Sequence, residues 1–448
     1  MTIEKKGLFT TVMMIFGSMV GAGLLVVPSK VMHYGFSSIC GWIIAALCSC
    51  VLGAIFSYTA VQDPDNHDTL TSSTRKIYGD LMGFFVCLYQ LIYINLGVAV
   101  VMITFNKYFN QILCINNKHT EFALCSGIMI LFIISHSTTK KSFDILKILT
   151  VIKLIFFGSL SVLGLICLNP AKLIGMPSDI AINFSSCIEG IMQNINKFGI
   201  AGMFTCASIS LFAFAGLEGG VQDLNSISNP KSTVPKATMI SIILASVIFI
   251  CTYIFAANQV SGISTDTPIK DAMEKMMVSF DLEQYSGYVG KIVAIIASLG
   301  CLGTVLALTY LTAGIAEEGY LIIMPHAKTY KTKSTSFPTL FGIFCALFVI
   351  FFIYYGLFIS MDCLEVIPYF IVGTYFHGVL LSIKKQPKNR LLNTIGIITC
   401  IILLTGCDRS QAIYFIIANM IGASVFAIFK KQGMHIKEEK NTDQQITH

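Results

Sequence analysis

The apolar runs of about 20 residues that recur along the chain constrain its fold more than any other feature. Each is long enough to cross the hydrocarbon core of a bilayer, which is roughly 30 Å thick. Of 448 residues, 55% are hydrophobic and only 12% are charged, whereas soluble proteins carry about 25% charged residues. The fourth and eleventh runs are short, so ten or eleven spans stay open as alternatives. The pattern predicts an all-α polytopic membrane protein with about twelve transmembrane helices, near residues 8–34, 36–61, 81–107, 122–137, 145–168, 202–222, 237–262, 287–316, 338–357, 363–383, 391–406 and 411–430.

The basic residues between these runs indicate the orientation. With both termini placed in the cytoplasm, most of the 30 Lys and Arg residues fall in cytoplasmic segments, with groups at 140–147, 328–333 and 384–390. The positive-inside rule describes this asymmetry, so we expect an integral multi-pass protein of the cytoplasmic (inner) membrane. The net charge of +6 then reflects topology, and no nucleic-acid partner is expected. We expect residues 431–448 to form a polar, disordered cytoplasmic tail.

Catalytic and metal-binding signatures are missing from the sequence. His136 and His377 are isolated, and neither HExxH nor GxSxG occurs, so we expect that the protein is not an enzyme. The 15 cysteines form no CxxC pair, which argues against a metal centre. No cofactor is expected either.

Glycines interrupt the first apolar run in "IFGSMVGAGLLVVP", residues 15–28. Gly17, Gly21 and Gly23 lie within seven residues, although glycine costs about 1 kcal/mol relative to alanine inside a helix. Irregular backbone at membrane depth occurs only where it is buried in protein or lines a cavity. The alternative is close helix packing, because Gly17 and Gly21 also have small-xxx-small spacing.

A second interruption lies in the sixth run, in "SLFAFAGLEGGVQDLNSISNP". Gly216, Gly219 and Gly220 surround Glu218, an ionisable residue in an apolar segment, and such a residue is a functional-site hypothesis by default. The first and sixth runs occupy corresponding positions if the first ten form two repeats of five. Paired interruptions of this kind point to the binding site of a transporter.

Several motifs resemble those of the amino acid–polyamine–organocation (APC) superfamily, and the pattern is most similar to its basic amino acid/polyamine antiporters. "GSMVGAGLLVVP" resembles the first-helix signature, "FAFAGLE" followed by "NPKSTVPKA" the sixth helix and its loop, "IYGDLMGFF" the third helix and "TAGIAEEGYLIIMP" the eighth. The resemblance implies a LeuT-like 5+5 inverted repeat with broken helices 1 and 6. It also implies a single transporter domain, residues 1–430. This domain consists of repeat one (about 8–168), repeat two (about 202–383) and two further helices (about 391–430).

The resemblance also implies transport of amino acids or related amines, with the broken helices as the binding site. Free N–H groups at Gly21, Ala22 and Gly23 suit a substrate carboxylate, because the N-terminus of a helix carries partial positive charge. Two positions depart from the pattern: Ala22 replaces a frequent serine, and Phe212 replaces a tryptophan whose face binds cations better. Free carbonyls suit the substrate ammonium, and the substrate-binding set is completed by Met19, Val20, Phe212, Ala213, Ala215 and Glu218.

Four residues are candidates for coupling or gating: Lys153, Glu218, Tyr89 and Tyr93. In its lysine at position 153 the chain resembles proton-coupled or sodium-independent permeases, and this resemblance implies that the ammonium occupies the space where sodium sits in sodium-coupled relatives. The alternatives are a snorkelling lysine, a structural role for Glu218, and ordinary packing for the two tyrosines.

The expected function is secondary active transport by alternating access, proton-coupled or by exchange. An obligate antiporter of the ornithine/putrescine or arginine/agmatine type is the alternative, and a non-transporting nutrient sensor or a channel is a remote one. The expected partners are the small-molecule substrate, protons and the lipid bilayer. A homodimer is left open.

Overall fold

The computed structural model describes residues 5–62, 69–137, 142–166, 184–217, 227–260, 266–323 and 362–446. Apart from one isolated bridge between Lys6 and Ile227, the regular structure in these ranges is helical. Eight of their helices are long and apolar enough to cross a membrane, and a ninth span is added if the bent pair at the N-terminus counts as one. The all-α polytopic class is therefore confirmed. The expected span at 338–357 lies outside the described residues.

Each remaining expected span coincides with a helix, or with a pair of helices at a break. The helices of the first half are α1 (Leu8–Met19), α2 (Ala22–Val31), η1 (Met32–Tyr34), α3 (Phe36–Ala60), α4 (Leu70–Tyr78), α5 (Asp80–Leu113), α6 (Lys118–Ser137) and α7 (Ser142–Ile166). Those of the second half are α9 (Phe184–Leu211), η2 (Phe212–Phe214), α10 (Pro230–Val260), α11 (Pro268–Ser279), α12 (Glu283–Ile323), α14 (Cys363–Lys385), α15 (Arg390–Thr405), η6 (Arg409–Gln411) and α16 (Ala412–Ile446).

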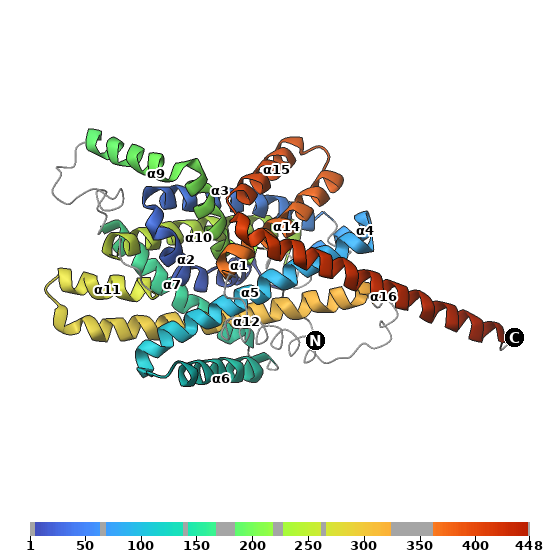
Figure 1. Cartoon of the computed structure of the whole chain (residues 1–448), viewed down its shortest axis with the longest axis horizontal. Helices are drawn as coiled ribbons and strands as arrows, with labels where there is room; N and C mark the ends of the chain where they lie inside the picture. The colour runs from blue at the N-terminus through green and yellow to red at the C-terminus, as the bar shows by residue number, and fades with distance from the viewer. Residues whose placement is uncertain are drawn as a thin grey trace.

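The broken pair α1–α2 lies at the centre of the bundle. Both helices contact α10 and α12, α1 also packs on α7, and α2 also packs on α5. Around them, α5 and α12 run side by side, and α3 packs against α9 and α10 (Figure 1). Phe16, Val20, Leu24 and Leu25 of the central pair are fully buried. The break is thus enclosed by protein on several sides, which is the setting that irregular backbone requires in a membrane.

The outer faces of the peripheral helices are apolar and exposed. On α16 the side chains of Ile416, Met420 and Ile421 are more than half exposed, and α7 and α15 show similar faces. Monomeric soluble proteins rarely expose contiguous apolar surface on this scale. These faces are therefore suited to contact lipid.

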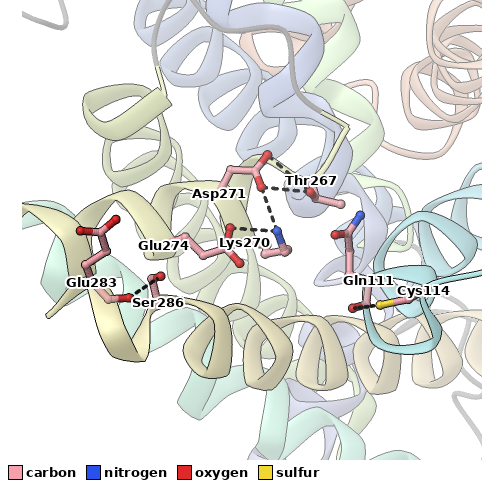
Figure 2. Close-up of polar contacts among 8 residues, drawn as sticks. All are labelled: Gln111, Cys114, Thr267, Lys270, Asp271, Glu274, Glu283 and Ser286. Atoms are coloured by element: carbon pink, nitrogen blue, oxygen red, sulfur yellow. Dashed lines mark hydrogen bonds and ion pairs between the residues drawn. The ribbon is translucent and has the colours of Figure 1, made fainter.

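Helix α11 is a short amphipathic element packed on α10 and α12. Its Lys270 Nζ lies 2.9 Å from Glu274 Oε2 and 3.3 Å from Asp271 Oδ1 (Figure 2). Burial acts to lower the pKa of Lys270, but the hydrogen bonds and charges of Glu274 and Asp271 outweigh it and the pKa is raised. These ion pairs lie within α11 itself, and α11 also contacts α2, one half of the break.

The C-terminal segment differs from the expectation. Residues 431–446 continue α16 as a helix, and this end of the helix projects away from the bundle (Figure 1). The expectation of disorder is wrong as far as Ile446. The segment "KEEKNTDQQ" is rich in Lys, Glu and Gln, which have high helix propensity, so a helix that starts in the membrane can continue through it.

Candidate functional site

The first break separates α1 from α2 at Val20 and Gly21. Val20 has an extended backbone, with φ −79° and ψ 107°, although its N–H still donates to Phe16 O at 2.9 Å. Helix α2 begins at Ala22, and the two halves meet at a bend of 43°. The last carbonyls of α1 and the first N–H groups of α2 lack partners within their helices. Polar backbone groups are thus available in the middle of an apolar span.

The second break follows α9. After α9 the chain forms the 3-10 turn η2, and the helix ends at Ala215, which has an extended ψ of 134°. Gly216 then has φ 105°, a backbone conformation that residues other than glycine rarely adopt. Phe214 anchors this break, because its ring packs 5.1 Å from Phe249 and 6.5 Å from Trp42 between centroids. Phe212 lies on the other side of η2, where it lines a pocket.

The two breaks touch each other directly. A Cβ atom on Gly23 would lie 2.7 Å from Ala213 Cα, so only glycine allows α2 to approach η2 this closely. The hydroxyl of Ser18, at the end of α1, lies 2.9 Å from Gly216 O and 2.8 Å from Ile15 O. These contacts bring together the two glycine-rich interruptions that are about 200 residues apart in the sequence.

Lys153 of α7 binds the end of α1. Its ammonium donates to Val20 O at 2.9 Å, to Gly17 O at 3.3 Å and to Thr304 Oγ1 of α12 at 2.9 Å. The side chain is 1% exposed. A lysine ammonium has three donors, so each has an acceptor here, which is the condition under which a charge is tolerated in a buried site. Lys153 thereby ties three helices together at the break.

The glycines of the first break also allow close packing. A Cβ on Gly17 would lie 2.4 Å from Thr150 Oγ1 of α7, and one on Gly21 would lie 2.2 Å from Thr304 Oγ1. Close helix packing and an open backbone therefore occur at the same residues. The two interpretations of the glycines from the sequence are not exclusive.

A pocket lies between the two breaks and the helices α5 and α12. Of the expected site residues it is lined by Met19, Gly23, Tyr93, Phe212 and Ala215. Sequence reasoning missed Ser18, Ile94, Gly97, Val101, Thr304 and Leu308, which also line it. Hydroxyls and aliphatic side chains in apolar helices are common, so only the position of Ser18 inside the glycine signature offered a signal.

The remaining expected residues lie in other places. Val20 and Gly21 lie at the first break and Ala213 lies in η2, and none of the three lines the pocket. Ala22 is the first residue of α2. Tyr89 packs instead between α14 and α16, where its hydroxyl donates to Asn419 Oδ1 at 2.6 Å and its ring lies 5.3 Å from Phe415. Glu218 lies outside the described residues.

Within the ranges that the structure describes, no three His, Cys, Asp or Glu side chains are grouped so as to hold a metal ion. Among the described residues, the polar groups at the pocket include the hydroxyls of Ser18 and Thr304, and Thr304 Oγ1 accepts from the ammonium of Lys153.

A match to a known protein family identifies the family of the chain. The model of the family described as "Amino acid permease" matches residues 7–437, which is nearly the whole chain. The chain belongs to the amino acid permease family. Members of this family are membrane transporters rather than enzymes, and the family implies a LeuT-like fold for the permease.

Curated relatives of the permease are distant. A putrescine transporter PotE of Haemophilus influenzae is 27% identical over 132 residues, 29% of each chain. A cadaverine/lysine antiporter of Escherichia coli is 25% identical over 260 residues, 57% of the permease and 53% of the relative. The putrescine transporter PotE of Escherichia coli is 19% identical over 325 residues, 71% and 69% of the two chains. The matches to the first two relatives thus cover about half of their length or less.

Proposed function

We propose that the permease is a secondary active transporter that moves α-amino acids or related amines across the cytoplasmic membrane by alternating access. The single observation that carries this proposal is the direct contact of two broken helices beside one pocket, with Gly23 of α2 against Ala213 of η2. In the full proposal, about twelve spans form two inverted repeats of five and two further helices. Both termini lie in the cytoplasm, because that orientation puts most Lys and Arg residues there.

The two breaks offer complementary groups to an amino acid. The N-terminus of α2, at Ala22 and Gly23, presents N–H groups and partial positive charge to a carboxylate. Carbonyl groups at the end of α1 and in η2 present partial negative charge to an ammonium. Val20 O already accepts from Lys153 and Phe212 O from the Ala215 N–H. Because a carbonyl oxygen has two lone pairs, each retains one for the substrate.

Coupling is proposed to run through Lys153. Its ammonium holds α1 against α7 and α12 through the carbonyls of Gly17 and Val20 and the hydroxyl of Thr304. A neutral amine has one proton fewer to donate, so loss of a proton weakens this attachment and lets α1 move. Glu218 is the competing proton carrier.

Obligate exchange is the second candidate. The observation that favours it is the similarity to a protein named cadaverine/lysine antiporter. Exchange needs no proton step. In this case the side chain of Lys153 stays protonated throughout the cycle and has a structural role.

The deciding experiment is a radiolabelled uptake panel of amino acids and amines in proteoliposomes, with and without internal substrate and with an imposed pH gradient. Net uptake driven by the gradient supports proton coupling, and flux that requires internal substrate supports exchange. Binding without any flux indicates a sensor, and flux without counterflow indicates a channel. In a parallel assay, substrate at 100 times its dissociation constant should stabilise the purified permease by about 2.7 kcal/mol, whereas a sugar should not.

A further inference from the structure

The walls of the pocket carry information about the substrate side chain. Tyr93, Ile94, Gly97 and Val101 of α5 line the pocket, together with Leu308 of the neighbouring helix α12. Ile94 and Val101 are each 1% exposed. The side chains that the described residues place around this pocket are all uncharged.

The hydroxyls at the pocket already have protein partners. Ser18 Oγ is held by the carbonyls of Ile15 and Gly216. Thr304 Oγ1 donates to Gly300 O at 3.0 Å and accepts from Lys153. Lys153 therefore places a positive charge directly behind the pocket wall. A side-chain ammonium directed toward Leu308 would meet no carboxylate among the described residues that line the pocket, and an unpaired buried charge is strongly disfavoured.

At Gly97 the pocket lining lacks a side chain, beside Phe212 and Leu308. A Cβ atom at this position would lie 3.5 Å from Phe212 Cε2 and 3.9 Å from Leu308 Cδ1, which is ordinary van der Waals contact. The missing side chain of Gly97 thus faces the gap between the ring of Phe212 and the aliphatic wall. An amino acid whose backbone binds at the breaks would direct its side chain into this gap.

We infer that the substrates are neutral α-amino acids with medium-sized apolar side chains, such as leucine, norleucine or methionine. The inference rests on the proposed function and specifies its substrate class. Diamines fit this site poorly, because they carry no carboxylate for the N-terminus of α2 and would bring one ammonium against the apolar wall. The substrate class therefore differs from the diamines and lysine in the names of the similar proteins.

The first test compares norleucine with lysine, which differ only by a terminal ammonium. Labelled leucine is the probe in a counterflow assay with the purified full-length permease in proteoliposomes. We expect norleucine to compete at a concentration at least about 100-fold lower than lysine, putrescine or cadaverine. If lysine or a diamine is exchanged and leucine is not, the inference is overturned and the proposed function remains intact. Absence of exchange for every amino acid and amine would overturn both.

The second test narrows the gap with Gly97→Ala. The added methyl group makes only ordinary contacts and alanine favours a helix over glycine, so the variant should fold. We expect about tenfold weaker competition by norleucine and unchanged competition by alanine. The matched control is Gly158→Ala on α7, where a Cβ meets nothing within 4 Å, and it should alter neither. Equal weakening for both amino acids in Gly97→Ala would contradict this position of the side chain.

The third test adds a counter-charge. Leu308→Glu should bring lysine competition to within about tenfold of norleucine, while the matched variant Leu308→Gln, of the same size but neutral, should not. Lysine binding that is equally improved by both changes would argue against an electrostatic basis. If the wild-type permease prefers lysine and Glu218→Gln reverses that preference, Glu218 supplies the counter-charge. That outcome would overturn the inference.

Discussion

The two halves of the broken first helix are each held by a lysine, in opposite environments. Lys153 binds the end of α1 from α7, with its ammonium on two carbonyls and a hydroxyl and its side chain 1% exposed. Lys30, on α2 itself, forms an ion pair with Asp362 at the start of α14, and these side chains are 41% and 26% exposed. One attachment is buried and the other faces solvent.

The difference in burial implies a difference in strength. Exposed ion pairs contribute about 0–1 kcal/mol, because water and salt screen them and the long side chains lose entropy. A buried acceptor that loses its donor costs about 1–3 kcal/mol. The polar attachment of α1 therefore depends on the presence and protonation of one side chain, whereas the ion pair of α2 can be broken at little cost, because α2 is held mainly by its buried packing.

The largest expected effect comes from Lys153→Met, which keeps an unbranched apolar chain of nearly the same length and removes its donors. The carbonyls of Gly17 and Val20 and the hydroxyl of Thr304 then lose a partner. We expect a loss of about 2 kcal/mol or more in stability and a flat pH profile of uptake between pH 5 and 8. Thermal melting and proteoliposome uptake measure the two effects.

Two matched variants sharpen this result. Lys153→Gln retains two amide donors and should recover part of the stability but none of the pH dependence. Glu218→Gln should leave the pH dependence in place if the lysine carries the proton. A wild-type pH profile in Lys153→Met would show that the lysine is structural and would favour obligate exchange.

The next effect in size concerns Gly23→Ala. Its methyl group would lie 2.7 Å from the backbone of Ala213, so no side-chain rotation can relieve the contact and the two breaks must separate. We expect loss of substrate binding and about 1–3 kcal/mol of destabilisation, measured by counterflow and by melting. Gly158→Ala is again the control, since its methyl group meets open space. Wild-type affinity in Gly23→Ala would contradict the contact between the breaks.

A smaller effect is expected for Thr304→Val, which removes one of the three acceptors of Lys153 and preserves the shape of the side chain. Loss of one hydrogen bond to a charged group costs about 1.5–3 kcal/mol, and we place this variant at the lower end because two carbonyls remain. Thr304→Ser keeps the hydroxyl and should melt close to wild type. If the two variants melt alike, the hydroxyl does not hold the lysine.

The eight or nine candidate spans among the described residues and the position of the first break could be predicted from the sequence, because the bilayer leaves few alternatives. Lipid offers no hydrogen bonds, so a run of about 20 apolar residues must form a helix. The glycines located the first break correctly, since α1 ends at Met19 and α2 begins at Ala22. The helical continuation of α16 was missed because polar composition was taken as a sign of disorder, although the same residues favour a helix.

The details of the site depend on which helices pack together, and the sequence does not show this. Thr304 and Leu308 occur in an unremarkable apolar helix, and their place at the pocket follows only from the packing of α12 on α5. Tyr89 and Tyr93 lie one helical turn apart, yet Tyr93 lines the pocket and Tyr89 faces α14 and α16. Gly21 is a further example, since the contact of its missing side chain with Thr304 depends on a helix about 280 residues away.

The smallest expected effect is that of the exposed pair. Lys30→Met and Asp362→Asn should each change stability by less than about 1 kcal/mol, and the change should shrink further in 0.5 M salt because exposed charges are screened. Asp362→Ala should cost about 1 kcal/mol more, since Asp362 Oδ1 also accepts the Leu364 N–H at 3.0 Å and caps α14, a bond that asparagine can replace. Melting of the three variants at two salt concentrations separates the cap from the ion pair. A loss in Lys30→Met as large as that in Lys153→Met, at both salt concentrations, would remove the distinction between the buried polar attachment of α1 and the exposed ion pair of α2.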